Sequence, residues 1–227
     1  MPKLNLIQGS PEWHLFRERH IMATAASCII GLNPYKSCFN LWEEMMCMAP
    51  PVIMNTAMKR GVELEPFARE IACKILEMEF DPCVYLSDQF YWQAASLDGL
   101  YIPNNVVLEI KCPNKIVHEA ASVCSIPEYY ICQLQHQISV TNASKAIYFS
   151  YRPNNKGKEN GEPEFFILDV FRNEEFIKEL EKIEWNFWTD FCRLQSPSIV
   201  IDNEILEYRR ALLKKTQIQL LQLPKES

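Results

Sequence analysis

The sequence has no apolar run long enough to cross a membrane, and its first residues, MPKLNLIQGSPEW, lack the apolar core of a secretory signal. Its nine cysteines lie at least eight residues apart and include no C-x-x-C pair, which argues against a zinc ribbon, a redox dithiol and a dense disulfide scaffold. Internal repeats and low-complexity segments are also missing. These absences predict a globular protein of a prokaryotic or viral cytoplasm, with reduced cysteines and no membrane partner.

An excess of positive charge is missing too. The net charge of -6 argues against a protein that coats nucleic acid nonspecifically, because such a protein needs clustered Lys and Arg. It does not exclude an enzyme that works on nucleic acid through a local basic groove. With 227 residues, 48% of them hydrophobic, the chain can bury one substantial core. We predict one domain over residues 1–195 and a C-terminal helical extension over 196–227 that packs on the body or on another subunit.

Periodicity and turn signals predict a mixed α/β protein. Ser10-Pro11-Glu12 is typical of a helix start, with a Ser cap and Pro at the first helical position. The expected helices cover residues 11–19, 24–30, 37–48, 55–79, 127–141, 173–193 and 202–221. The expected strands cover 83–87, 90–95, a limb around Leu100, 106–111, 146–151 and 165–170, with a polar hairpin loop at 154–163.

The most informative stretch is SLDGLYIPNNVVLEIK, Ser96 to Lys111, which is typical of a β-hairpin. In a strand Glu109 and Lys111 share one face, and Asp98 can reach that face from the neighbouring limb. An E-x-K pattern on a solvated strand is common, but here the flanking residues are apolar, and buried charges need a compensating partner. Two carboxylates beside an ammonium form a site for a divalent cation and a nucleophilic water.

Residues on the long helix of 55–79 are weaker candidates. Its apolar stripe is expected to contain Leu64, Phe67, Ile71 and Ile75. Glu65 lies at the border of that stripe on a face shared with two alanines, so its carboxylate has room to point inward. Met58, Lys59 and Arg60 could contact a substrate. The residue types favour the alternative, in which Met58 is buried and both cations are solvated.

Two further features have competing interpretations. Thr24 at a helix start, with Arg17 from the preceding helix, could form an anion pocket, although a plain Thr cap is the simpler reading. Gln133 and Gln137 lie one turn apart on the predicted helix of 127–141. Glutamines on a helix are ordinarily exposed polar residues.

Five spaced motifs resemble one family. They are W-H-x-x-R, A-T-A-A-S-C-I-I-G, G-x-E-x-E-P-x-A, the pair S-L-D-G with L-E-I-K-C-P, and Y-I-C-Q-L-Q. In this order, from Trp13 to Phe191, they resemble the PD-(D/E)XK nucleases, and more narrowly the YqaJ-type viral recombinases typified by the exonuclease of phage lambda. The resemblance implies a restriction-endonuclease-like core, with a central mixed β-sheet flanked by helices, N-terminal helices and a C-terminal helical extension.

The resemblance also implies site residues. Asp98 and Glu109 match the acidic metal ligands, and the Ile110 carbonyl matches a backbone ligand. Lys111 takes the position of the Lys that orients the attacking water and helps to deprotonate it. Glu65 matches the helical Glu that supports a second metal ion or its waters. One or two Mg²⁺ ions per site are implied, with Mn²⁺ as a substitute.

Gln133 corresponds to the glutamine that positions the water or a metal-bound neighbour. Arg17, Thr24 and Ser96 match positions that hold a terminal 5′ phosphate, with Thr24 in place of the usual Ser.

The implied activity is digestion of one strand of linear double-stranded DNA, 5′ to 3′ from a phosphorylated end, by a ring-shaped homotrimer that works with a single-strand annealing protein. An endonuclease of the same fold or a RecB-like nuclease is the alternative, although the cluster of the latter needs several C-terminal cysteines and only Cys192 lies there. A noncatalytic DNA-end-binding module ranks lower, because Asp98, Glu109 and Lys111 are all present.

Overall fold

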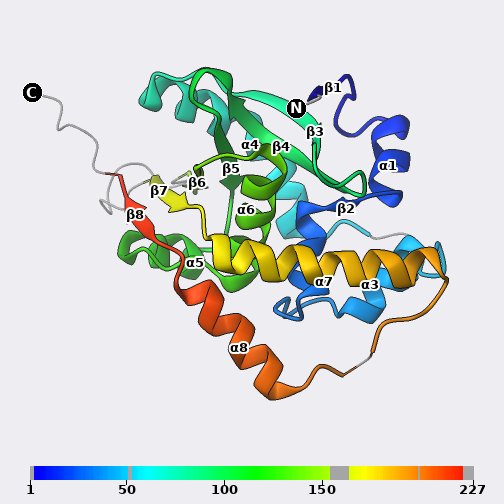
Figure 1. The fold of residues 1–227 in the computed structure, drawn as a ribbon. Coiled ribbons are helices and arrows are strands. Elements are labelled where there is room, and N and C mark those ends of the chain that lie inside the picture. Colours follow the sequence, from blue (N-terminus) through cyan, green and yellow to red (C-terminus); the bar gives the residue numbers. More distant parts are fainter. Residues whose placement is uncertain (1–2, 51–52, 154–163, 199, 222–227) are drawn as a thin grey trace, which may run out of the picture.

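A single mixed β-sheet forms the centre of the molecule in the computed structural model, which describes residues 3–50, 53–153, 164–198 and 200–221. Its strands are β1 Lys3–Leu4, β2 Ile21–Met22, β3 Asp81–Leu86, β4 Gln93–Tyr101, β5 Val106–Lys111, β6 Lys145–Tyr151, β7 Phe165–Phe171 and β8 Ile218–Leu220. The strand order is β1-β3-β4-β5-β6-β7-β8, and β2 pairs parallel to β4 (Figure 1). Because β5 and β6 are also parallel while their other neighbours are antiparallel, the predicted mixed sheet is confirmed.

Helices cover both faces of this sheet. They are α1 Pro11–Glu18, α2 Ala26–Ile29, α3 Cys38–Met45, α4 Thr56–Leu76, α5 Lys115–Ala120, α6 Glu128–Thr141, α7 Glu174–Cys192 and α8 Asn203–Lys214, with 3-10 turns η1 Ala23–Ala25, η2 Ile102–Asn104 and η3 Ala121–Val123. The predicted start of α1 is confirmed, since the Ser10 hydroxyl accepts the Trp13 amide at 3.2 Å. Over the described ranges, no helix combines the length and the apolar character needed to span a bilayer.

Alternation along β5 separates two apolar cores. Val107 belongs to the core beneath α6, α7 and α8, whereas Leu108 and Ile110 belong to the core beneath α4. Successive side chains of a strand point to opposite faces. Glu109 is therefore directed with Val107 toward α6, where polar groups of α6 and the Lys111 ammonium of β5 itself surround it.

Close packing explains the glycine after Asp98. Gly99 lies within β4 opposite Leu108, and a Cβ there would stand 2.6 Å from the Cβ of Phe80. No real Cβ tolerates that approach, so the missing side chain lets β4 lie against the segment that follows α4. The chain reverses farther on, at η2 and Asn105, whose φ of 49° is left-handed.

Two local expectations are wrong. The strands expected at 90–95 and around Leu100 form one continuous strand, β4. Phe67 of the expected α4 stripe is 62% exposed, because the buried face centres on Ala68 and Ala72, both 0% exposed. The long helix packs closely on the sheet through these alanines, and the bulky Phe67 is turned outward.

The last expected helix, over 202–221, is also wrong in its second half. α8 ends at Lys214, and Ile218–Leu220 then forms β8, antiparallel to β7 (Figure 1). Ile218 and Leu220 pack on the larger core while Gln219 between them is exposed, which is the period of a strand and not of a helix. The polar hairpin loop expected at 154–163 lies outside the described residues.

Candidate active site

The β4–β5 hairpin brings the predicted acidic residues together. Its backbone pairing reaches Gly99 opposite Leu108, and the next contact is made by a side chain: Asp98 Oδ2 accepts the Ile110 amide at 2.8 Å. Nearby, the Asp98 carbonyl accepts a hydrogen bond from Arg69 Nε of α4 at 2.6 Å. Asp98 is thus held from both sides, and within the described residues its Oδ1 accepts no hydrogen bond.

Glu109 is a buried carboxylate surrounded by donors. Its side chain is 2% exposed. One oxygen accepts the Lys111 ammonium and the Gln133 amide, the latter at 2.5 Å, and the other oxygen accepts the Gln137 amide at 2.5 Å. Three charge-assisted hydrogen bonds repay much of the cost of burying the charge. They also fix the direction of the carboxylate relative to α6.

Lys111 is the cation of this cluster. Its ammonium pairs with Glu109 and lies 4.9 Å from the centre of the Tyr130 ring. Burial opposes the charge, but the carboxylates of Glu109 and Asp98 outweigh burial and raise the pKa of Lys111. The side chain is therefore an ammonium that donates hydrogen bonds at neutral pH.

The other two carboxylates of the cluster, those of Asp98 and Glu65, have raised pKa values. Burial, followed by the charges of Glu109 and Glu65, raises the pKa of Asp98 well above its usual range. Glu65 of α4 is half-buried and pairs with Arg69; burial and the Glu109 charge raise its pKa against the opposing effect of Arg69. Buried carboxylates crowded together in this way favour the arrival of a cation.

The donor set fits a Mg²⁺ ion that keeps some of its waters. Among the described residues, no three His, Cys, Asp or Glu side chains form a group that could hold a metal ion by themselves. Mg²⁺ in proteins is commonly bound by one or two carboxylates, with water or substrate phosphate in the other positions. Asp98 and Glu109 provide two such carboxylates, and the carbonyl of Ile110 stays a predicted third ligand.

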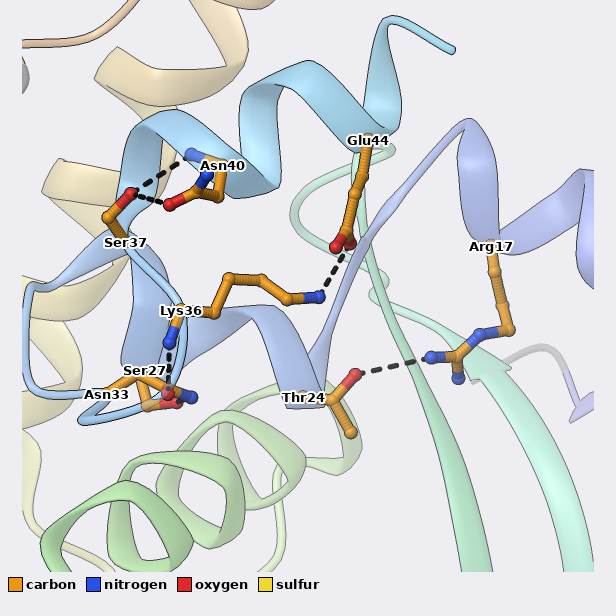
Figure 2. A network of polar contacts seen from close by, with 8 residues as sticks. All are labelled: Arg17, Thr24, Ser27, Asn33, Lys36, Ser37, Asn40 and Glu44. Atoms are coloured by element: carbon orange, nitrogen blue, oxygen red, sulfur yellow. Dashed lines mark hydrogen bonds and ion pairs between the residues drawn. The ribbon is translucent and has the colours of Figure 1, made fainter. Parts of the chain in front are cut away.

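The residues predicted to bind a terminal phosphate are only partly brought together. Arg17 Nη2 donates to Thr24 Oγ1 at 3.3 Å, so these two side chains share one site (Figure 2). Ser96 instead accepts the indole N–H of Trp13 at 2.7 Å. Arg17 lies over the same indole, 4.5 Å from its ring centre, so Trp13 stands between Ser96 and the Arg17–Thr24 pair.

The three candidates at the start of α4 differ in their surroundings. The favoured reading of Met58 as a core residue is wrong: its side chain is 42% exposed, because it lies in the first turn, beyond the edge of the core. Lys59 is exposed, as expected. Arg60 is not free in solvent, since its Nη2 donates to the carbonyl of Cys112 at 2.7 Å, directly after Lys111.

Three residues at the site escaped prediction from the sequence. Gln137 bonds Glu109 as closely as Gln133 does, and its signal was the spacing of one helical turn between the two glutamines. Arg69 follows Glu65 by one turn, which also places both on one face. Tyr130, against Lys111, begins the Y-I-C-Q-L-Q motif, but no role was predicted for it.

The fold and these side chains define a class. A mixed sheet whose central hairpin carries Asp98, Glu109 and Lys111, covered by α4 and α6, is a restriction-endonuclease-like α/β core. Residues 12–144, more than half of the sequence, match the YqaJ-like viral recombinase domain. The chain belongs to the YqaJ-like viral recombinase family.

Relatives and solved structures agree with this assignment. The chain is 24% identical over 214 residues to the uncharacterized protein YqaJ of Bacillus subtilis strain 168. The aligned part covers 91% of this chain and 64% of that protein, so this chain spans less than two thirds of that relative. The alkaline exonuclease LHK-Exo of Laribacter hongkongensis superimposes with a TM-score of 0.68 at 24% identity, covering 90% of this chain and 99% of that one. Its complex with dAMP gives 0.66 at 26% identity over 90% and 99%. A phage-related exonuclease of Haemophilus somnus 129PT gives 0.58 at 12% identity over 77% and 94%.

Proposed function

We propose that the protein is a divalent-metal-dependent deoxyribonuclease. The observation that carries the proposal is the meeting of Asp98, Glu109 and Lys111 at one point of the sheet, with Glu65 close enough to raise the pKa of Asp98. The resemblance in fold to LHK-Exo, an alkaline exonuclease, supports a nuclease as well.

Asp98, Glu109 and the Ile110 carbonyl would hold Mg²⁺ or Mn²⁺, and Glu65 would support a second ion through water. When bound, the ion supplies Lewis-acid charge at the phosphate and acidifies a water. Lys111, as an ammonium, orients the attacking water by a hydrogen bond. Gln133 fixes the Glu109 carboxylate from α6, so that the ligand does not rotate away.

The finer proposal is an exonuclease. We infer that it digests one strand of linear double-stranded DNA 5′ to 3′ from a phosphorylated end, and leaves a 3′ single-stranded tail for recombination by strand annealing. The pairing of Arg17 with Thr24 beside the hairpin supports an anion pocket for the 5′ end. A homotrimeric ring, an annealing protein as partner and a cytoplasmic location belong to the same proposal and rest on the family resemblance.

One incubation tests class, polarity and end preference together. The substrates are linear duplexes with a 5′ phosphate or a 5′ hydroxyl, each with one strand labelled, and a covalently closed circle, all with Mg²⁺. The proposal expects rapid loss of the phosphorylated 5′ strand and survival of the circle. Cleavage of the circle would favour the endonuclease alternative, and intact DNA in every lane would leave only the noncatalytic DNA-end-binding module.

A further inference from the structure

A polar cavity of about 280 Å³ lies between α1, η1 and α3, apart from the metal ligands. Its lining includes Arg17, Thr24, Lys36 from the loop before α3, and Glu44 of α3. Figure 2 shows Lys36 reaching Glu44 on one side of Thr24 and Arg17 reaching Thr24 from the other. The cavity therefore has a cation on each side of a hydroxyl.

Arg17 brings a positive charge to a cavity that the carboxylates of Glu18 and Glu44 also line. Within the part of the chain that the structure describes, it forms no ion pair; its partners are the Thr24 hydroxyl and the Trp13 ring. The side chain is half-buried, and this burial lowers the pKa of its guanidinium. A bound anion would compensate that charge.

The loop that carries Lys36 to the cavity is held by hydrogen bonds of Asn33. Asn33 Nδ2 donates to Ser27 Oγ at 2.9 Å (Figure 2). Its Oδ1 accepts the backbone N–H groups of Tyr35 at 2.8 Å and of Lys36 at 3.0 Å. The ammonium of Lys36 then meets Glu44 Oε2 at 2.6 Å, with both side chains about one-third exposed. A partly exposed pair of this kind is weak and can exchange partners.

Ser96, the third residue expected at the phosphate, does not line this cavity and bonds Trp13 instead. We propose that Lys36 binds the terminal 5′ phosphate together with Arg17 and Thr24, and that Glu44 holds the Lys36 ammonium in position until the phosphate replaces it. The inference rests on the proposed function, because it assumes that a DNA 5′ end enters this cavity.

The exchange explains how an end is selected. A terminal phosphate carries nearly two negative charges and three acceptor oxygens, so it can displace the single carboxylate of Glu44 from Lys36. A 5′ hydroxyl has no charge and cannot compete for the ammonium. Lys36 therefore sets the preference for phosphorylated over unphosphorylated ends and takes no part in bond cleavage.

The test measures binding without metal, so it does not depend on catalysis. The dissociation constants of short blunt duplexes with 5′ phosphate or 5′ hydroxyl are measured by fluorescence anisotropy in EDTA. Lys36→Ala should lose about ten- to a hundredfold of the wild-type preference for phosphate, as expected for a charge-assisted contact, with hydroxyl-end affinity unchanged. Lys36→Arg should retain most of it. Lys182→Ala, which removes an exposed ammonium paired with Glu179 on α7, is the matched control.

Glu44→Gln separates binding from a structural role, because it breaks the same ion pair as Lys36→Ala. We expect Glu44→Gln to keep or increase the phosphate preference, since the competing carboxylate is gone. Equal losses in both variants, or equal affinity of the wild type for the two ends, would overturn the inference. A different outcome is that Lys36 sets the phosphate preference but the protein cleaves no DNA with Mg²⁺. That result would refute the proposed nuclease and leave the binding inference standing.

Discussion

Replacing Lys111 by Met removes the ammonium that balances Glu109 and keeps most of the side chain's length. The Glu109 carboxylate, 2% exposed, would keep only the amides of Gln133 and Gln137, each at 2.5 Å. Removing one partner of a buried ion pair costs about 3–5 kcal/mol, and the two remaining donors place this case near about 3 kcal/mol. At about 2–4 °C per kcal/mol for a chain of this size, the melting temperature should fall by about 6–12 °C.

The assay compares thermal unfolding in EDTA and in Mg²⁺. Mg²⁺ should raise the melting temperature of Lys111→Met more than that of the wild type, because the bound ion restores positive charge beside Glu109. The variant should still bind linear DNA but not cleave it, since the group that orients the water is gone. Lys111→Met combined with Glu109→Gln is the matched control: the neutral amide should recover stability in EDTA and lose the response to Mg²⁺. A Lys111→Met protein that melts with the wild type in EDTA would refute this account of Glu109.

Three other changes have defined outcomes. Gln137→Ala should lower the free energy of unfolding by about 1.5–3 kcal/mol and slow cleavage, as measured by denaturant titration and initial rates, because one oxygen of Glu109 loses its donor. His136 is buried with both ring nitrogens facing acceptors, Glu184 at 2.7 Å and a backbone carbonyl at 3.0 Å; its pKa is raised, the Glu184 charge overcoming the larger single effect of burial. The contribution of protonated His136 to stability is thus complete below about pH 6.5 and is lost as pH rises through the folded pKa, by at most about 1.4 kcal/mol per pH unit. Unfolding titrations over this pH range compare the wild type with Glu184→Gln. A wild type that shows no such loss relative to Glu184→Gln would contradict the prediction. Gly99→Ala should lower the melting temperature, because the added Cβ would stand 2.6 Å from a phenylalanine Cβ; calorimetry showing wild-type stability would contradict this packing.

The hairpin could be predicted because local signals and chemistry agree there. Alternating residues around Glu109, the turn before Val106 and the charge cost of a buried E-x-K all point to one arrangement. The long helix was harder: its apolar residues identify a helix, but only its contact with the sheet shows that Ala68 and Ala72, and not Phe67, face inward. A periodic pattern gives the element and leaves its rotation to tertiary packing.

Contacts between distant parts of the chain account for what was missed. Gln137 becomes a partner of Glu109 only because α6 crosses that face of β5. Ser96 is paired with Trp13, 83 residues away, and neither signals the other in sequence. The sequence after α8 gives no strong strand signal, and β8 forms there by pairing with the edge of β7.

The central claim is that the acidic cluster of the β4–β5 hairpin cleaves DNA with a divalent cation. It is tested most directly by Mg²⁺-dependent release of nucleotides from labelled linear duplex by the wild type, Asp98→Asn and Asp81→Asn, the last an exposed acid on β3 outside the site. We predict that the wild type and Asp81→Asn release nucleotides at similar rates and that Asp98→Asn, folded and bound to DNA, releases none. Digestion by Asp98→Asn at the wild-type rate would contradict the claim.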